Sequence, residues 1–180
     1  MRAFLIVLMS CTVSLAADIV SDERTAILAK EKAQAFIDGA CIKAPAGITS
    51  FWTPTMSDLH DIEDGLLEFL MRVRPELAQW LSGKSRDGED RRTWMRRWVT
   101  GASKGEQHYL FISYQCEWPA ETAKKEQEIK AKSERMGRPY HPDHWKDGPP
   151  YVDGGGWMFF RVLFDVRERK FVWYEENFPY

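Results

Sequence analysis

Residues 108–118 read HYLFISYQCEW, and this stretch decides the expected fold. Aromatic and β-branched residues dominate it, and alternate side chains of an extended chain point to the same face. The pattern predicts a β-strand with one face on the core. The residues that share this face are His108, Leu110, Ile112, Tyr114, Cys116 and Trp118.

Three further strands are expected around this one. Residues 94–100 are again rich in aromatic and β-branched types, and the glycine-containing segment 101–105 is typical of a hairpin connection. Near the C-terminus, apolar residues alternate over 158–166, a charged turn follows at 167–170, and a last strand is expected over 171–178. The sequence therefore predicts two antiparallel hairpins.

Helical spacing precedes the strands. Apolar residues recur at this spacing over 21–40 and again over 59–73, and Pro75 marks the end of the second segment. A short helical continuation is expected through Leu77, Trp80 and Leu81. We therefore predict an α+β fold, with two N-terminal helices packed on one face of a four-stranded antiparallel sheet made of two hairpins.

Residues 119–156 separate the two hairpins. Glutamates precede lysines by four positions over 121–132, which favours a solvent-exposed helix, and few apolar residues are present to pack it. An irregular loop rich in proline and glycine is expected from Gly137 to Gly156. Long loops in compact domains are commonly functional, so this excursion is a candidate for a binding role.

The first 16 residues are typical of an export signal. Arg2 precedes an apolar run, and Ser14 and Ala16 are small residues at the positions that a signal peptidase reads, so cleavage is expected after Ala16. Residues 17–180 would then form a single secreted or periplasmic domain without a transmembrane segment, since no apolar run is long enough to span a bilayer. The alternative is a lipoprotein signal with an acylated Cys11.

The charge balance limits the class of ligand, and the cysteine content indicates a disulfide. The chain has 25 Lys and Arg against 27 Asp and Glu, and this slightly acidic balance argues against nucleic acid as a ligand. The two cysteines after the signal, Cys41 and Cys116, are expected to form a disulfide in an oxidising compartment. Two buried free thiols are the alternative.

Cations and rings alternate in residues 91–98. If this segment is extended, Trp94, Arg96 and Trp98 form a ladder on one face that suits an aromatic or sugar-like ligand or a protein partner. Tyr140 and Trp145 of the long loop complete the predicted binding residues. In the alternative interpretation these rings pack onto the body of the domain and arginine stems cover the tryptophans.

His141, Asp143 and His144 lie close together in the loop and are residue types that bind zinc and similar ions. The alternative is a polar surface loop. No nucleophile elbow, metalloprotease motif or phosphate-binding loop is present in the sequence. The preferred hypothesis is an exported non-enzymatic binding protein, such as an inhibitor or immunity protein, without a cofactor. The competing hypothesis is a small metal-assisted hydrolase that uses the His141 and His144 loop and a divalent metal.

Overall fold

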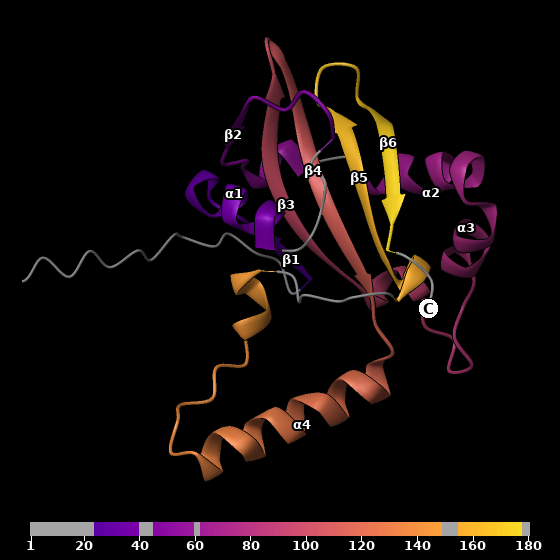
Figure 1. The fold of residues 1–180 in the computed structure, drawn as a ribbon. Coiled ribbons are helices and arrows are strands. Elements are labelled where there is room, and N and C mark those ends of the chain that lie inside the picture. Colours follow the sequence, from indigo (N-terminus) through magenta and orange to yellow (C-terminus); the bar gives the residue numbers. More distant parts are fainter. Residues whose placement is uncertain (1–23, 40–44, 60–61, 149–154, 178–180) are drawn as a thin grey trace, which may run out of the picture.

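The computed structural model describes residues 24–39, 45–59, 62–148 and 155–177 (Figure 1). Within these residues, a twisted sheet carries helices on both sides, and one long helix extends beyond it. The strands are β1 (Thr25–Ile27), β2 (Ser50–Trp52), β3 (Met95–Lys104), β4 (Gln107–Cys116), β5 (Phe159–Asp165) and β6 (Lys170–Glu176). The α-helices are α1 (Lys30–Gly39), α2 (Ile62–Val73), α3 (Pro75–Ser82) and α4 (Pro119–Arg135), and short 3₁₀ helices are η1 (Met56–Leu59), η2 (Arg91–Trp94), η3 (His144–Asp147) and η4 (Gly156–Met158).

The six strands form one mixed sheet in the order β1-β3-β4-β5-β6, with β2 also paired to β3. The pairs β3–β4 and β5–β6 are the two predicted hairpins, and β4 pairs antiparallel to β5. Strand β1 runs parallel to β3, which the sequence did not indicate. The predicted four-stranded antiparallel sheet with helices at the N-terminus is therefore wrong.

The error arises from two strands of three residues each, β1 and β2, which are too short to show a period. Residues 21–40 were expected to form one helix, but α1 begins only at Lys30. Thr25, Ala26 and Ile27 before it are fully or almost fully buried and pair with β3, and the N–H of Leu28 continues this pairing to the carbonyl of Val99 at 2.8 Å. Burial on both faces removes the alternation that marks a half-exposed strand.

Gly101 explains why β3 is longer than the segment 94–100. The hairpin connection was expected to begin at this glycine, but the strand continues to Lys104 and turns at Gly105. A Cβ atom at Gly101 would lie 2.2 Å from the indole of Trp52, so only glycine lets β2 approach β3 here. The Trp52 indole N–H donates to the carbonyl of Ala102 at 3.3 Å. This glycine therefore marks a close approach within the sheet and not a turn.

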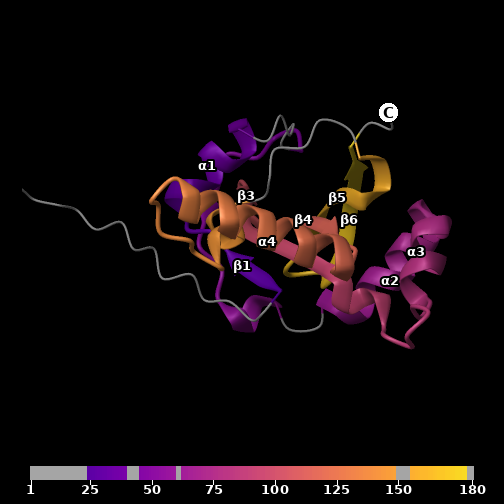
Figure 2. The same cartoon turned by 90° about the horizontal axis from the view of Figure 1, so that it is seen from below.

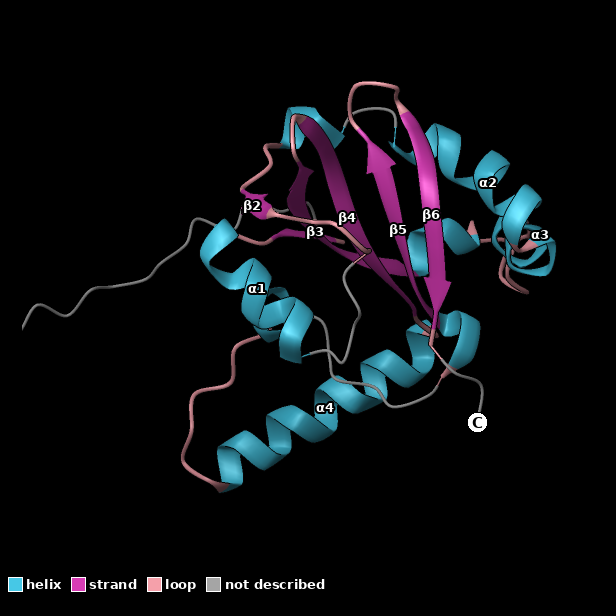
Figure 3. Ribbon diagram, turned by 45° about the horizontal axis from the view of Figure 1, so that its top comes forward, coloured by secondary structure: helices cyan, strands magenta, loops and turns pink. Residues whose placement is uncertain are grey.

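The two faces of the sheet have different covers (Figures 2 and 3). Helices α2 and α3 cover the face that carries Val99, Leu110 and Ile112, and we call it the helix face. The opposite face carries Trp98, Ala102 and Phe111, and Trp145 of η3 packs there, so we call it the excursion face. Helix α1 lies beside η3, where Lys32 pairs with Asp147 at 3.9 Å.

Helix α4 confirms the exposed helix expected in the excursion. Pro119 occupies its first turn, where a missing N–H costs nothing, and most of its side chains are exposed. The helix leads away from the end of β4, and residues 136–143 bring the chain back to η3 and β1 (Figure 1). Among the described residues, no helix is long and apolar enough to cross a membrane.

Candidate functional site

Three of the five predicted binding residues, Arg96, Trp98 and Trp145, meet on the excursion face. Trp98 is 1% exposed, and its indole N–H donates to the carbonyl of Trp145 at 2.7 Å. The two rings pack edge to face with centroids 5.9 Å apart, and the guanidinium of Arg96 lies 4.8 Å from the Trp145 ring centre. These residues contact one another, and their contacts attach η3 to the sheet.

A buried carboxylate continues this attachment. Glu117 accepts from Arg24 at 3.1 Å and pairs with Arg96 at 3.1 Å, while Arg96 also lies 3.8 Å from Glu126 of α4. The Tyr140 hydroxyl donates to Glu126 at 2.5 Å, so the return segment is tied to α4 as well. Burial raises the pKa of Glu117, although Arg96 and Arg24 act in the opposite direction.

Trp94, the fifth predicted residue, lies elsewhere. It belongs to η2 and precedes the first residue of β3, so it does not share a strand face with Arg96 and Trp98. Its indole N–H donates to Glu89 at 3.0 Å. The ring packs against two other tryptophans, with centroids 6.2 Å from Trp80 and 5.8 Å from Trp118. The sequence-predicted ladder is thus divided between two places in the fold.

We call Trp80, Trp94, Trp118 and Trp157 the tryptophan cluster. They come from α3, η2, the residue before α4, and η4, four segments that converge at one end of the sheet. Trp80 is central, since its ring centroid lies 5.5 Å from that of Trp118 and 5.0 Å from that of Trp157. Trp118 is 37% exposed, and Trp80 and Trp157 are half-buried. Several large ring faces therefore reach the surface together.

A small pocket opens beside this cluster. Its volume is about 270 Å³, and Trp80, Trp157, Leu77, Arg74 and Glu76 line it. The ring faces and Leu77 supply apolar contact area, and the two charged residues supply hydrogen-bonding groups. We call it the tryptophan pocket. Apolar walls with a few placed polar groups are typical of small-molecule sites.

Arg74 organises the polar rim of the tryptophan pocket. It follows α2, and it bonds Glu76 at 3.0 Å and Glu176 of β6 at 3.1 Å. The Tyr174 hydroxyl donates to the same Glu176 oxygen at 2.8 Å. The hydrogen bond and charge of Glu176 raise the pKa of Arg74, and burial together with Glu176 raises the pKa of Tyr174. The rim is thus a preformed network in which Arg74 carries its charge and Tyr174 its proton.

Sequence reasoning missed Trp157, Arg74 and Glu176, and placed Trp80 only in a short helix. They lie far apart in the chain, and no spacing rule connects them. The one available signal was composition, since eight tryptophans in 180 residues exceed what a small core needs. Only the convergence of α3, η2 and η4 brings the rings to one pocket.

Two of the predicted metal ligands, His141 and Asp143, precede η3, and the third, His144, is its first residue. His141 is exposed, and the Asp143 carboxylate pairs with Lys146 at 3.2 Å; the side chain of His144 lies outside the described ones. Among the described residues, no group of three or more His, Cys, Asp and Glu side chains is placed to hold a metal ion. The metal site at His141, Asp143 and His144 stays a prediction.

Cys116 is buried on the helix face and forms no disulfide with another described residue, and burial together with Glu117 raises the pKa of its thiol to about 12. Thiols of this kind are unreactive because the thiolate is the nucleophile. Cys41 lies outside the described residues, so the disulfide between Cys41 and Cys116 stays a prediction.

The tryptophan pocket offers stacking surfaces, a fixed guanidinium and carboxylate oxygens, and these groups suit reversible binding of a small ring. Comparison with known protein families, curated proteins and solved structures finds no match to the chain.

Proposed function

We propose that this chain is an exported binding protein that holds an aromatic or sugar-like ligand in the tryptophan pocket. The observation that carries the proposal is the meeting of Trp80 and Trp157, half-buried and 5.0 Å apart between ring centroids, beside Arg74 and Glu76. Export rests on the predicted signal peptide of residues 1–16.

The pocket matches this ligand class in size and chemistry. A volume of about 270 Å³ lies near the lower end of ligand sites and suits one or two rings. Indole faces stack on the flat, C–H-rich surfaces of rings, while Arg74 donates to and Glu76 accepts from the polar edge of a ligand. Because Glu176 holds Arg74 in place, little side-chain entropy is lost when a ligand binds.

The same network supports binding more than catalysis. Cleavage of a glycosidic bond requires one protonated and one ionised carboxyl group near the substrate. Near the tryptophan pocket, the carboxylates of Glu76 and Glu176 are both bonded to Arg74, which they hold in place. No observation in the described residues favours the metal-assisted alternative.

The test is a binding screen with a matched control. The purified chain is titrated with glucose, N-acetylglucosamine, cellobiose and indole, and binding is followed by tryptophan fluorescence and calorimetry. We expect one of these probes to bind, and Trp157→Ala to weaken it about tenfold or more, since stacking on an aromatic face is lost.

The control is Trp173→Ala, because Trp173 is another half-buried tryptophan but packs against the excursion-face core. Thermal unfolding checks that both variants are folded. The proposal is wrong if none of the probes binds, or if Trp157→Ala and Trp173→Ala change the affinity equally.

A further inference from the structure

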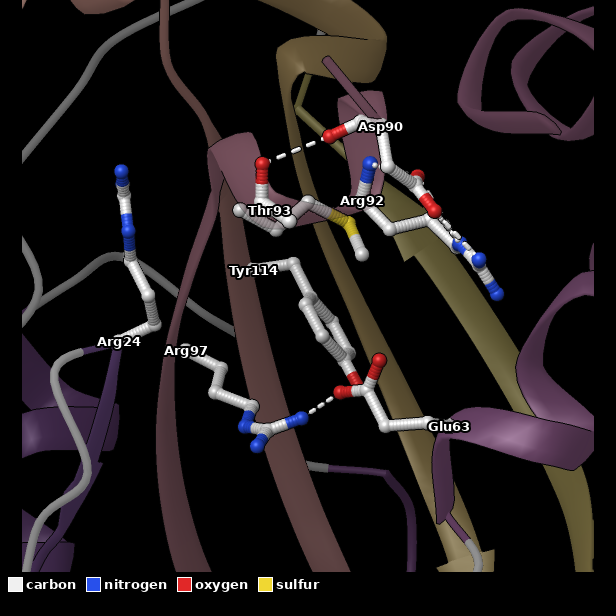
Figure 4. Close-up of a pocket in the computed structure, with 8 residues that line it drawn as sticks. Arg24, Glu63, Asp90, Arg92, Thr93, Arg97 and Tyr114 are labelled. Atoms are coloured by element: carbon white, nitrogen blue, oxygen red, sulfur yellow. Dashed lines mark hydrogen bonds and ion pairs between the residues drawn. The ribbon is translucent and has the colours of Figure 1, made fainter. Parts of the chain in front are cut away.

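A second and larger cavity, which shares no lining residue with the tryptophan pocket, lies on the helix face (Figure 4). Its volume is about 520 Å³, within the range of small-molecule sites. The residues that matter are Arg24, Glu63, Asp90, Arg92, Arg97 and Tyr114. We call it the arginine cavity. None of these residues contributes to the function proposed above.

Strand register explains why two of these side chains converge. Arg97 of β3 is paired directly with Tyr114 of β4, so the two side chains leave the sheet on the same face. Thr25 of β1 is the partner of Arg97 on its other side, and the Arg97 guanidinium donates to its hydroxyl at 2.5 Å. A guanidinium and a phenol are therefore held next to each other by the sheet itself.

The Tyr114 hydroxyl is the unusual group in this cavity. Tyr114 is 1% exposed, and its hydroxyl makes no hydrogen bond with any atom of the described residues. The ring is fixed, because it stacks on Phe160 with centroids 4.8 Å apart and planes 12° from parallel. Burial raises the pKa of Tyr114 to about 12, so the hydroxyl keeps its proton as a donor. Buried donors without acceptors are rare and call for a partner.

The cavity is lined by three arginines and two carboxylates. With Glu117, which pairs with Arg24, the charges balance, so an anion can bond one of these cations by taking the place of a carboxylate. Asp90 holds Arg92 through paired hydrogen bonds, and Glu117 holds Arg24. Arg97 forms its ion pair with Glu63 of the first turn of α2 (Figure 4). Each cation is thus positioned by a carboxylate of the protein.

Glu63 is the replaceable member of this set. Its side chain is 46% exposed, whereas that of Arg97 is 18% exposed, so Glu63 can turn to water while Arg97 cannot. Figure 4 shows the Glu63 carboxylate bonded to the Arg97 guanidinium, with the Tyr114 side chain directed toward the same pair. A carboxylate of a ligand placed there would bond the guanidinium and accept from the unused phenol.

We propose that the arginine cavity binds a small organic carboxylate, which displaces Glu63 from Arg97 and accepts a hydrogen bond from Tyr114. The proposal is independent of the tryptophan pocket. It assigns opposite effects to two neighbouring residues, because Tyr114 holds the ligand and Glu63 competes with it.

The experiment is calorimetric titration of the purified chain with succinate, citrate and benzoate. Succinamide and benzamide serve as uncharged counterparts, and inorganic phosphate tests for a general anion site. We expect at least one carboxylate to bind at one site per chain, at least about tenfold more tightly than its amide or phosphate. The amide lacks the charge for a charge-assisted bond to Arg97, and phosphate does not have the planar shape of a carboxylate.

Two variants separate this proposal from nonspecific charge effects. Tyr114→Phe should weaken the carboxylate about fivefold or more, while the ligand-free protein keeps its melting temperature because the removed hydroxyl had no partner. Glu63→Gln should strengthen binding, because the competing carboxylate is gone. Trp157→Ala should leave the affinity unchanged, so failure here and failure at the tryptophan pocket are distinguishable.

Three results would overturn the proposal. The first is that no carboxylate binds at millimolar concentration. The second is equal binding of carboxylates and phosphate, with no response to Tyr114→Phe. The third is weaker binding by Glu63→Gln, since that would make Glu63 part of the site and not its competitor.

Discussion

The two faces of the sheet are closed by different means. On the helix face, α2 and α3 bury a continuous set of leucine, isoleucine and phenylalanine side chains. On the excursion face, Trp145 of one short helix packs on a smaller apolar cluster, and a few charged contacts through Arg96, Glu117 and Glu126 hold the rest of the excursion. The comparison shows that α2 and α3 are held on the helix face mainly by buried apolar area, whereas the excursion is held by a small number of specific contacts.

The largest effect is expected on the helix face. Leu70 of α2 is fully buried in its core, and Leu70→Ala should lower the free energy of unfolding by about 4 kcal/mol, because a cavity remains between two packed layers. Urea unfolding measures it. Met71→Ala is the control, since Met71 is 51% exposed and its change should stay within about 0.5 kcal/mol. A small effect at Leu70 would mean that the helices are not the main cover.

A smaller effect is expected from Trp145→Ala on the excursion face. The free energy of unfolding should fall by about 2 kcal/mol, because η3 is short and can settle into part of the space. Trp98 beneath it should become accessible, which acrylamide quenching and hydrogen exchange of its indole N–H would detect. Ile129→Ala on exposed α4 is the control. If Trp98 stays protected, another segment covers this face.

The smallest effect concerns Glu117 and depends on pH. The pKa of Glu117 is raised in the folded protein, so the folded state favours the protonated carboxyl group. The stability that this adds is fully present below the pKa of the unfolded state, about 4.3 for glutamate. It is lost as the pH rises through the pKa of the folded state. Glu117→Gln removes this loss. As the pH rises from 4 to 7, the free energy of unfolding of the variant should therefore rise relative to that of the wild type. Thermal melting curves of both proteins at these two pH values measure this change.

Glu121→Gln provides the comparison for this pH test, since Glu121 is exposed on the first turn of α4. Its stability relative to the wild type should change less over the same interval. The opposite trend for Glu117→Gln, a relative loss on going to higher pH, would show that Arg24 and Arg96 outweigh the cost of burying the carboxylate.

Much of the sheet followed from local pattern. Strand β4 spans ten residues rich in aromatic and β-branched types, so the strand and its hairpin with β3 could be predicted, although both of its faces are buried from Tyr109 to Tyr114. The acidic and basic pairs of α4 predicted an exposed helix. Strands β1 and β2 could not be predicted, because three residues are too few to show a period. Gly101 was interpreted as a turn because glycine has the same local signature in a turn and in a close approach.

The candidate sites also depend in part on local sequence pattern and in part on tertiary packing. The sequence by itself determined which residue types are abundant, above all tryptophan and arginine, and which lie on one strand face, such as Arg96 and Trp98. Only the tertiary structure decided that Trp98 is covered by Trp145, that Trp80 meets Trp157, and that Tyr114 lies beside Arg97. The physical reason is range: periodicity and propensity act over a few residues, whereas a binding site is made by packing segments that are far apart in the chain.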